Sequence, residues 1–208
     1  MDGDALSRGM QDLAKQFASG FSGRLNFLAT AARQWKAAFW FKQGRLANLD
    51  YYQQSGERAL FNFCYDFGVP LMKQGASSHP LAPFAWVAEP EVFKGVDLWS
   101  WAWPNFWAAW QAKIQEVAPY QQKAPAGDYQ LRPTRLGDQM MQATLPYAAH
   151  PLGHVAQQVQ VLKSIVQFPM VDDLYHQTSW PPGELTRYLV ELKQQGLIKA
   201  VRATHHSS

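Results

Sequence analysis

The 208-residue chain is long enough to form one large domain or two small ones, each with its own core. Charged residues make up only 17% of it and aromatic residues 14%, a balance that leaves apolar surface for a partner or for self-association into a homodimer. The net charge of +3 is spread thinly along the chain, so the composition lacks the basic block typical of nucleic-acid-binding proteins.

Cysteine usage and hydropathy set the expected compartment. The single cysteine, Cys64, excludes an internal disulfide and a zinc site built from several cysteines, and its apolar surroundings predict a buried thiol. The first residues lack the basic start and apolar stretch of a signal peptide, and no run approaches eighteen apolar residues. We therefore expect a cytoplasmic protein without a membrane span.

The first third of the chain has a regular pattern of elements. Apolar residues at helical spacing over 4–19 predict an amphipathic helix. Strands are expected at 23–29, 36–43 and 45–53, the last two joined by a tight turn at Gln43-Gly44. Ser55 then precedes an apolar run as the expected N-cap of a further helix.

The middle of the chain is less regular. Four prolines between 69 and 95 predict an irregular segment, with a short strand near 84–87. Five tryptophans follow within VDLWSWAWPNFWAAW, where Pro104 is well suited to open a helix over 104–117. Residues 118–138 have the composition of a linker, and 138–149 predict a short helix.

The last quarter has a pattern of its own. Helices are expected at 155–167, around 168–178 and over 179–195, the third with Ser179 as its cap. That helix ends at Gly196, and LIKAVRA after it predicts a strand. Its expected inner face is Leu185, Tyr188, Leu189 and Leu192. Three helices followed by a glycine and a strand are the outline of a small winged-helix domain.

The first block contains three motifs in a fixed order within residues 4–67: Ser22-Gly23-Arg24-Leu25, Phe41-Lys42-Gln43-Gly44-Arg45-Leu46 and Gly56-Glu57-Arg58-Ala59-Leu60. In this order they resemble the PATAN family of bacterial signalling modules. The resemblance implies a protein-interaction module, with a response-regulator receiver or a motor ATPase of type IV pilus motility as partner. The chain departs from the family plan in having no recognisable receiver domain and no evident closing strand after the Gly56 helix.

The tryptophan cluster has two interpretations that the sequence leaves open. The face from Phe106 to Val117 is expected to pack two lobes together, whereas Trp99, Trp101 and Trp103 form a candidate partner-binding surface rich in aromatic anchors. Single-strand binding and membrane anchoring are disfavoured, because residues 96–112 contain no Lys or Arg.

Enzyme chemistry finds little support in the pattern. His150 and His154 are four apart, but Pro151 and Gly153 separate them and no further ligand completes a metal set. Asp172-Asp173 fits the start of a short helix better than acid–base work. No phosphate loop or nucleophile elbow is present. We expect neither cofactor, metal nor catalytic residue.

The sequence thus predicts an α+β protein with three parts: a PATAN-like domain at 1–95, a Trp-rich helical bridge and linker at 96–150, and a winged-helix-like domain at 151–204. The preferred function is a non-enzymatic signalling adaptor that binds protein through Trp99, Trp101 and Trp103, with Arg187 and Tyr188 as a second surface. The alternative is a DNA-binding regulator that uses Arg187 and Lys193 of the last helix.

Overall fold

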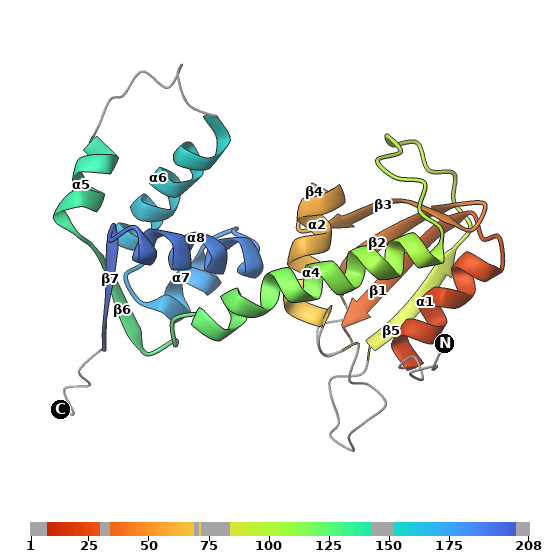
Figure 1. The fold of residues 1–208 in the computed structure, drawn as a ribbon, viewed down its shortest axis with the longest axis horizontal. Helices are drawn as coiled ribbons and strands as arrows, with labels where there is room; N and C mark the ends of the chain where they lie inside the picture. The colour runs from red at the N-terminus through yellow and green to blue at the C-terminus, as the bar shows by residue number, and fades with distance from the viewer. Residues whose placement is uncertain (1–7, 30–33, 69–70, 72–83, 143–151, 203–208) are drawn as a thin grey trace. The chain divides into compact units, whose positions relative to one another are not determined.

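The structure is a computed structural model that describes residues 8–29, 34–68, 71, 84–142 and 152–202. The chain forms two compact units, Met1–Ala118 and Pro119–Ser208, called unit 1 and unit 2 below. The class is α+β, as the sequence predicts (Figure 1). Within the described residues, no helix combines the length and the apolarity that crossing a membrane requires.

Unit 1 is built on an antiparallel sheet of five strands in the order β4-β3-β2-β1-β5. The strands are β1 (Gly23–Ala29), β2 (Gln34–Lys42), β3 (Arg45–Tyr51), β4 (Gln54–Ser55) and β5 (Phe84–Glu89). The turn between β2 and β3 has positive φ at Gln43 (49°) and Gly44 (71°), the geometry of a tight hairpin whose twist matches the strands. The three predicted strands are therefore confirmed to within two residues.

Helices cover one face of this sheet. They are α1 (Arg8–Ala18), α2 (Gly56–Phe63) with the π-helical turn Cys64–Gly68 after it, and α4 (Trp103–Lys123). Aromatic rings fill the space between the layers, with Phe63 edge-on to Phe39 at 5.2 Å and Trp110 beside Phe63 at 5.8 Å between centroids. Burying such rings is the main source of stability in this unit.

The short strand predicted near 84–87 is confirmed as β5, which pairs with β1 from Arg24↔Glu89 to Ala29↔Phe84. One prediction about unit 1 needs correction. Ser55 does lie at the N-cap of α2, but its side chain makes no capping bond and donates instead to Asp50 Oδ1 at 2.5 Å. Its hydroxyl therefore ties the β3–β4 turn together.

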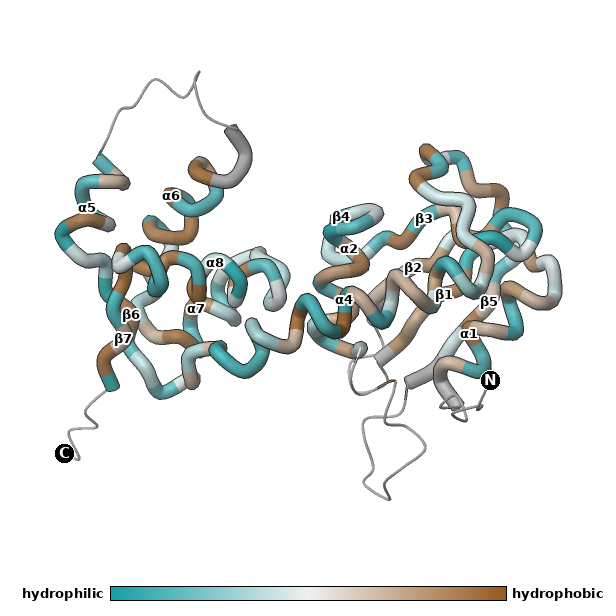
Figure 2. The backbone as a smooth tube through the Cα atoms, in the orientation of Figure 1, coloured by the Kyte–Doolittle hydropathy of each residue, from teal (hydrophilic) through white to brown (hydrophobic). Residues whose placement is uncertain are grey.

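Within its described residues, unit 2 combines a two-stranded ribbon with four helices. The elements are β6 (Tyr129–Pro133), α5 (Arg135–Gln142), α6 (Leu152–Gln167), α7 (Val171–Gln177), α8 (Pro182–Gln194) and β7 (Ile198–Arg202). Strands β6 and β7 are antiparallel, and an isolated bridge from Gln130 to Met170 lies on the other side of β6. Hydropathy alternates along α6, as expected for a helix with one face in a core (Figure 2).

The predicted linker at 118–138 is wrong. Helix α4 continues through Pro119 to Lys123, because a proline inside a helix removes one hydrogen bond without forbidding the next turn. Strand β6 follows at 129–133, and its partner β7 is nearly seventy residues later in the chain. Residues 96–150, predicted as one bridge, are thus divided between the two units, and 143–150 lie outside the described residues.

The core of unit 2 agrees better with the sequence. Leu185, Tyr188, Leu189 and Leu192 are all buried on the inner face of α8, as predicted. The N-cap of that helix is Pro181 rather than Ser179. A proline there fixes the extended backbone that precedes the first turn, so the start of α8 is set by backbone geometry and not by a side-chain cap.

Candidate functional site

Residues 90–101, called the strap, run from the end of β5 to the opposite side of the sheet, where they cover the edge of β3. Trp101 N donates to Leu46 O at 3.1 Å and Leu46 N donates to Trp101 O at 2.9 Å. Leu98 N and Trp99 N both donate to Ala47 O at 3.0 Å. Strand β4 pairs only with Asp50 and Tyr51, so the strap protects the part of β3 that would otherwise be an open edge.

Side chains of β2 hold the strap over the face of the sheet opposite to helices α1, α2 and α4, called the outer face below. The Trp40 ring lies 4.9 Å from the Phe93 ring, and its indole Nε1 donates to Asp50 Oδ2 at 2.7 Å. Nearer the edge, Lys42 Nζ is 2.6 Å from Asp97 Oδ2. The strap is therefore anchored by a ring contact, an exposed ion pair and backbone hydrogen bonds, of which the last two kinds are individually weak.

The five tryptophans of 96–110 divide into two stacked pairs and one core residue. Trp99 and Trp101 stack at 4.2 Å with 12° between their planes, because alternate residues of an extended chain point to the same side. Trp103 and Trp107 stack at 5.6 Å and 22°, four residues apart on α4. Trp110 is fully buried against Phe63 and Phe106.

The predicted role of the Phe106–Val117 face is thereby revised. Phe106, Trp110 and Val117 are fully buried, and the first two pack on aromatic residues of unit 1, including Phe39 of β2. These contacts build the core of one unit, whereas the sequence suggested that they join two lobes. The four other tryptophans of the cluster are half-buried, so part of each residue is open to solvent.

Apolar side chains project from the strap next to the first stacked pair. Val92 is 78% exposed, Val96 75% and Leu98 47%. Leu98 also approaches α2 closely: a Cβ on Gly56, where φ is +66°, would lie 2.7 Å from Leu98 Cδ1. Three exposed apolar residues within seven positions, beside half-buried indoles, form a surface that water solvates poorly.

A groove of about 300 Å³ lies on the same outer face of the sheet, one row of residues away from Trp40. It is lined by Arg24, Asn26, Ala37, Ala38, Asp50, Tyr51, Tyr52 and Gln53. Asn26 is only 2% exposed, and its amide Nδ2 has no partner at hydrogen-bond distance among the described residues, although the side chain contributes to the lowered pKa of Glu89. Tyr52 and Gln53 have φ of 50° and 58°, a conformation that costs energy in residues other than glycine.

Charge on this face is held by Arg24. Its guanidinium is 2.5 Å from Glu89 Oε2 and 3.5 Å from Glu91 Oε2, and it also lies over the Trp40 ring at 5.4 Å. The hydrogen bond from Arg24 lowers the pKa of Glu89, and the same bond raises the pKa of Arg24. The groove therefore keeps one cation, already paired, at its end near β5.

The residues predicted on the last helix belong to unit 2, and one of them is a correction. Tyr188 is fully buried and donates its hydroxyl hydrogen to Gln157 Oε1, so it cannot contact a partner. Arg187 is 28% exposed and lies 3.8 Å from Glu184, 4.0 Å from Glu191 and over the Tyr188 ring. Lys193 is exposed. Helix α8 is thus mainly a core helix.

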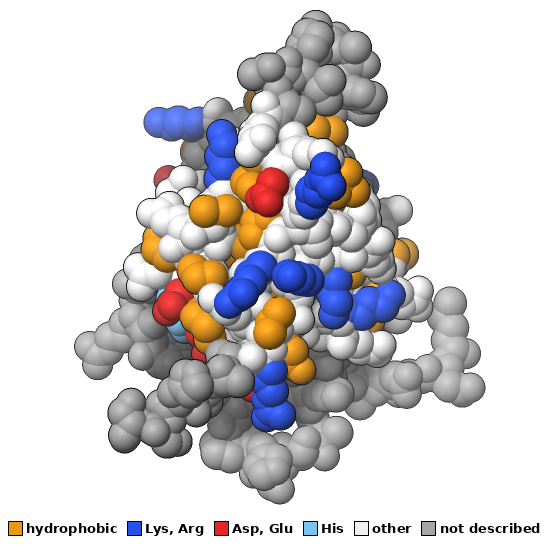
Figure 3. Space-filling model, turned by 90° about the vertical axis from the view of Figure 1, so that its left-hand side faces the viewer, with side chains coloured by type: hydrophobic (Ala, Val, Ile, Leu, Met, Phe, Trp, Pro, Cys, Tyr) orange, Lys and Arg blue, Asp and Glu red, His pale blue; other side chains and the backbone are white. Residues whose placement is uncertain are grey.

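Unit 2 also carries a pair of basic residues, called the basic ribbon, that the sequence pattern did not predict. Arg132 and Lys199 are direct cross-strand partners of β6 and β7, both are exposed, and neither has an ion pair within the described residues. Lys and Arg side chains gather in a row on the side of unit 2 where α5, β6 and β7 lie (Figure 3). The alternating pattern of YQLRP at 129–133 was the one local indication of strand β6. The sequence around it does not indicate that its partner strand is β7, which lies far along the chain.

The remaining candidate groups have structural positions. Cys64 is fully buried as predicted, and burial raises the pKa of its thiol well above the usual value. Asp172 and Asp173 lie in the first turn of α7, where they complement the helix dipole. His150 lies outside the described residues, and so does the side chain of His154. The described part of the chain holds no group of three or more potential metal ligands.

Comparison of the chain with known protein families, with curated proteins and with solved structures found no match.

Proposed function

We propose that this chain is a non-enzymatic, cytoplasmic signalling adaptor that binds a protein partner through the outer face of unit 1. The binding surface consists of the strap and the adjacent groove. The observation that carries the proposal is the exposure of Val92, Val96 and Leu98 beside the stacked pair Trp99 and Trp101. Exposed apolar patches of this kind occur where proteins bind one another.

The geometry suits protein binding for two reasons. Trp99 and Trp101 are already stacked and their backbones are fixed on β3, so binding would order them at little entropic cost. The groove supplies the buried amide of Asn26, whose Nδ2 has no partner at hydrogen-bond distance among the described residues and acts on the Glu89 carboxylate only; a carbonyl oxygen of a partner protein would give it a full hydrogen bond. A partner that covered both features would combine aromatic anchors with a specific hydrogen bond.

We further propose that unit 1 is a PATAN-like module and unit 2 a winged-helix-like module. The order helix, strand, hairpin and helix in unit 1 supports the first assignment. In unit 2 the support is α6, α7 and α8 followed by Gly196 and β7. The resemblance then suggests a response-regulator receiver or a pilus motor ATPase as the partner.

The test compares partner retention by matched surface variants. Leu98→Lys and Trp101→Ala alter the strap, and Val166→Lys changes an exposed valine on α6 of unit 2 (60% exposed, against 47% for Leu98). Each variant is immobilised and exposed to a host extract and, separately, to purified receiver domains. The proteins that it retains are quantified by mass spectrometry. At least one protein should be retained by the wild type and by Val166→Lys. The amount of that protein retained should be about tenfold or more lower with Leu98→Lys. An identical set on all four baits would refute the strap as the binding surface.

Nucleic-acid binding is the second candidate, and the structure changes the residues that would do it. Of helix α8 only Lys193 and Gln194 are exposed, so it presents too little surface to act as a recognition helix. The basic ribbon is better suited, because Arg132 and Lys199 lie opposite each other and neither has an ion pair among the described residues, an arrangement that is unfavourable unless anions are nearby. Phosphates would supply them.

Fluorescence anisotropy with a labelled random duplex at two salt concentrations tests this candidate. The double variant Arg132→Gln/Lys199→Gln should weaken binding and reduce the slope of log affinity against log salt by about two. The matched control, Lys15→Gln/Lys94→Gln, removes two exposed cations from unit 1 and should leave both unchanged. Absence of binding by the wild type at low salt would exclude the nucleic-acid candidate.

A further inference from the structure

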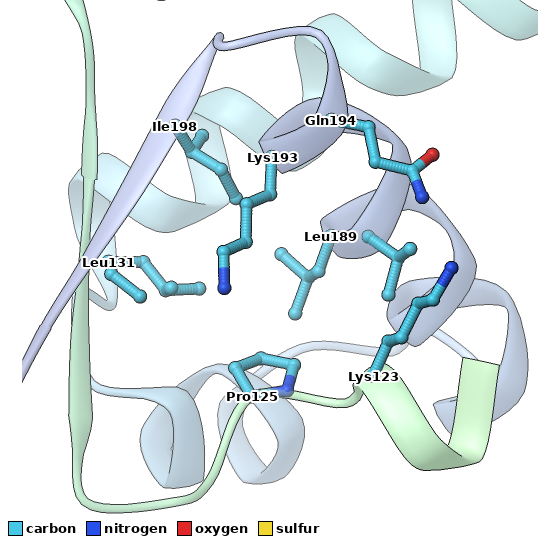
Figure 4. Close-up of a pocket in the computed structure, with 9 residues that line it drawn as sticks. Lys123, Pro125, Leu131, Leu189, Lys193, Gln194 and Ile198 are labelled. Atoms are coloured by element: carbon cyan, nitrogen blue, oxygen red, sulfur yellow. The ribbon is translucent and has the colours of Figure 1, made fainter. Parts of the chain in front are cut away.

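Unit 2 contains an apolar cavity of about 310 Å³ between the second half of α8, the inner face of the β6–β7 ribbon and the segment after α4 (Figure 4). Its walls are Pro125, Leu131, Leu189, Val190, Ile198 and Ala200. Leu131 and Ala200 are cross-strand partners, which explains why both point to the same side of the ribbon. The volume lies at the lower end of the range for small-molecule sites, roughly 300–1,000 Å³.

The charged groups of this cavity are two lysines. In Figure 4 the ammonium group of Lys193 points into the cavity between Leu131 and Leu189, whereas that of Lys123 lies on the far side of Leu189, toward Gln194. No Asp or Glu lines the cavity, and neither lysine has an ion pair within the described residues. The Lys193 ammonium group therefore lies over apolar side chains without an ion-pair partner among the described residues, a position that a bound anion would stabilise.

The end of helix α8 does not account for Lys193. Basic residues in a last turn often serve the free carbonyl groups there. In α8 these carbonyls already accept backbone bonds: Gln195 N donates to Glu191 O, Gly196 N to Lys193 O and Leu197 N to Leu192 O, at 2.9, 3.1 and 2.8 Å. The Lys193 ammonium group is therefore available to a ligand.

We infer that this cavity binds a small amphipathic carboxylic acid, with a medium-length alkyl chain or a single aromatic ring. The apolar part would lie among Leu131, Leu189 and Ile198, and the carboxylate would meet Lys193. Charge complementarity selects the anion, and the apolar floor selects the chain. The site lies within unit 2 and does not depend on the proposed partner-binding surface of unit 1.

Octanoate is a suitable probe, followed by amide shifts in ¹H–¹⁵N spectra of the full chain. Saturable shifts are expected at Lys193, Ile198 and Ala200. Octanol, which has the chain without the charge, and acetate, which has the charge without the chain, should each bind about tenfold or more weakly. Three results would each overturn the inference. Octanoate could bind no more tightly than octanol, acetate could give the same amide shifts as octanoate, or octanoate could give no saturable shift.

Variants distinguish the cavity from general surface binding. Lys123→Gln/Lys193→Gln should weaken octanoate about tenfold without affecting octanol, and Ala200→Leu should abolish both by filling the floor. Lys199→Gln, at the neighbouring position of β7 with its side chain on the opposite face, is the matched control and should bind as the wild type does. The lysine variants alter exposed side chains, so they test the inference even if Ala200→Leu fails to fold. Undiminished octanoate binding by the lysine double variant would contradict it.

Discussion

At the scale of single residues, Gly56 determines how closely the strap can approach α2. It combines a positive φ of +66° with the tight approach of Leu98, so a side chain there would be both strained and crowded. Gly20 has nearly the same φ, +68°, but a Cβ on it would meet nothing within 4 Å. The two glycines thus separate the cost of backbone strain from the cost of the strap contact.

Gly20→Ala is expected to lower the free energy of unfolding of unit 1 by about 1 kcal/mol, from backbone strain alone. Gly56→Ala should lower the free energy of unfolding by more than Gly20→Ala does, because the Leu98 side chain must also move to make room for the new Cβ. Urea denaturation compares the two, and ¹H–¹³C spectra follow the Leu98 methyl groups, which should shift only in Gly56→Ala. Equal losses and unshifted Leu98 methyls would show that the strap does not lie against Gly56.

At the scale of elements, α4 shows which tryptophans are structural. Trp110 is fully buried, whereas Trp107 on the same helix is half-buried and stacks on Trp103. Exposure of the two rings therefore differs although both come from the same short sequence. A cavity left by a buried ring is costly because the surrounding core relaxes only in part.

Trp110→Ala should destabilise unit 1 by about 3–5 kcal/mol, and Trp107→Ala by about 1 kcal/mol or less. The alkylation of Cys64 reports the unfolding of unit 1. Its thiol is fully buried in the native unit and will react with an alkylating reagent only when unit 1 opens. Alkylation rates in a urea series measure that opening. Similar rates in the two variants would contradict the assignment of Trp110 to the core.

Local signals explain which elements the sequence could predict. Strands β1, β2 and β3 follow one another through short connections, and Gly44 marks the turn between the last two, so their pattern is readable from neighbours alone. Strand β6 could not be predicted, because its partner β7 is far along the chain and its composition suggested a linker. Helix α4 extends beyond its predicted end at residue 117. The prediction ended there because a proline such as Pro119 usually terminates a helix.

The candidate site was predictable only in part for a similar reason. Trp99 and Trp101 were predicted as surface aromatic residues, and their half-buried rings are consistent with that role. The strap as a whole was not predictable, because the contacts of Phe93 with Trp40 and of Leu98 with Gly56 join residues about forty to fifty positions apart. Tyr188 was misassigned because burial on the inner face of α8 outweighs the aromatic character that favours interfaces.

At the scale of the whole molecule, the chain divides between Ala118 and Pro119, within α4. Each unit has its own buried core, the second one centred on Leu162, Leu174 and Leu185. Each core should therefore stabilise its own unit, so the two units are expected to unfold separately. In Trp110→Ala the amide spectrum of unit 2 should persist at urea concentrations where Cys64 already reacts, and simultaneous loss of both signals would argue for one cooperative unit.

The most direct test of the central claim is site-specific photocross-linking in the native host. A photoreactive phenylalanine analogue replaces Val96 of the strap, and in a matched control it replaces Val166 of unit 2; the two side chains are 75% and 60% exposed. Binding through the strap predicts a discrete protein adduct from position 96 that is absent from position 166 and is lost when Trp101→Ala is added. Adducts of equal yield at both positions, or none at position 96, would contradict the proposal that the strap is where this protein binds its partner.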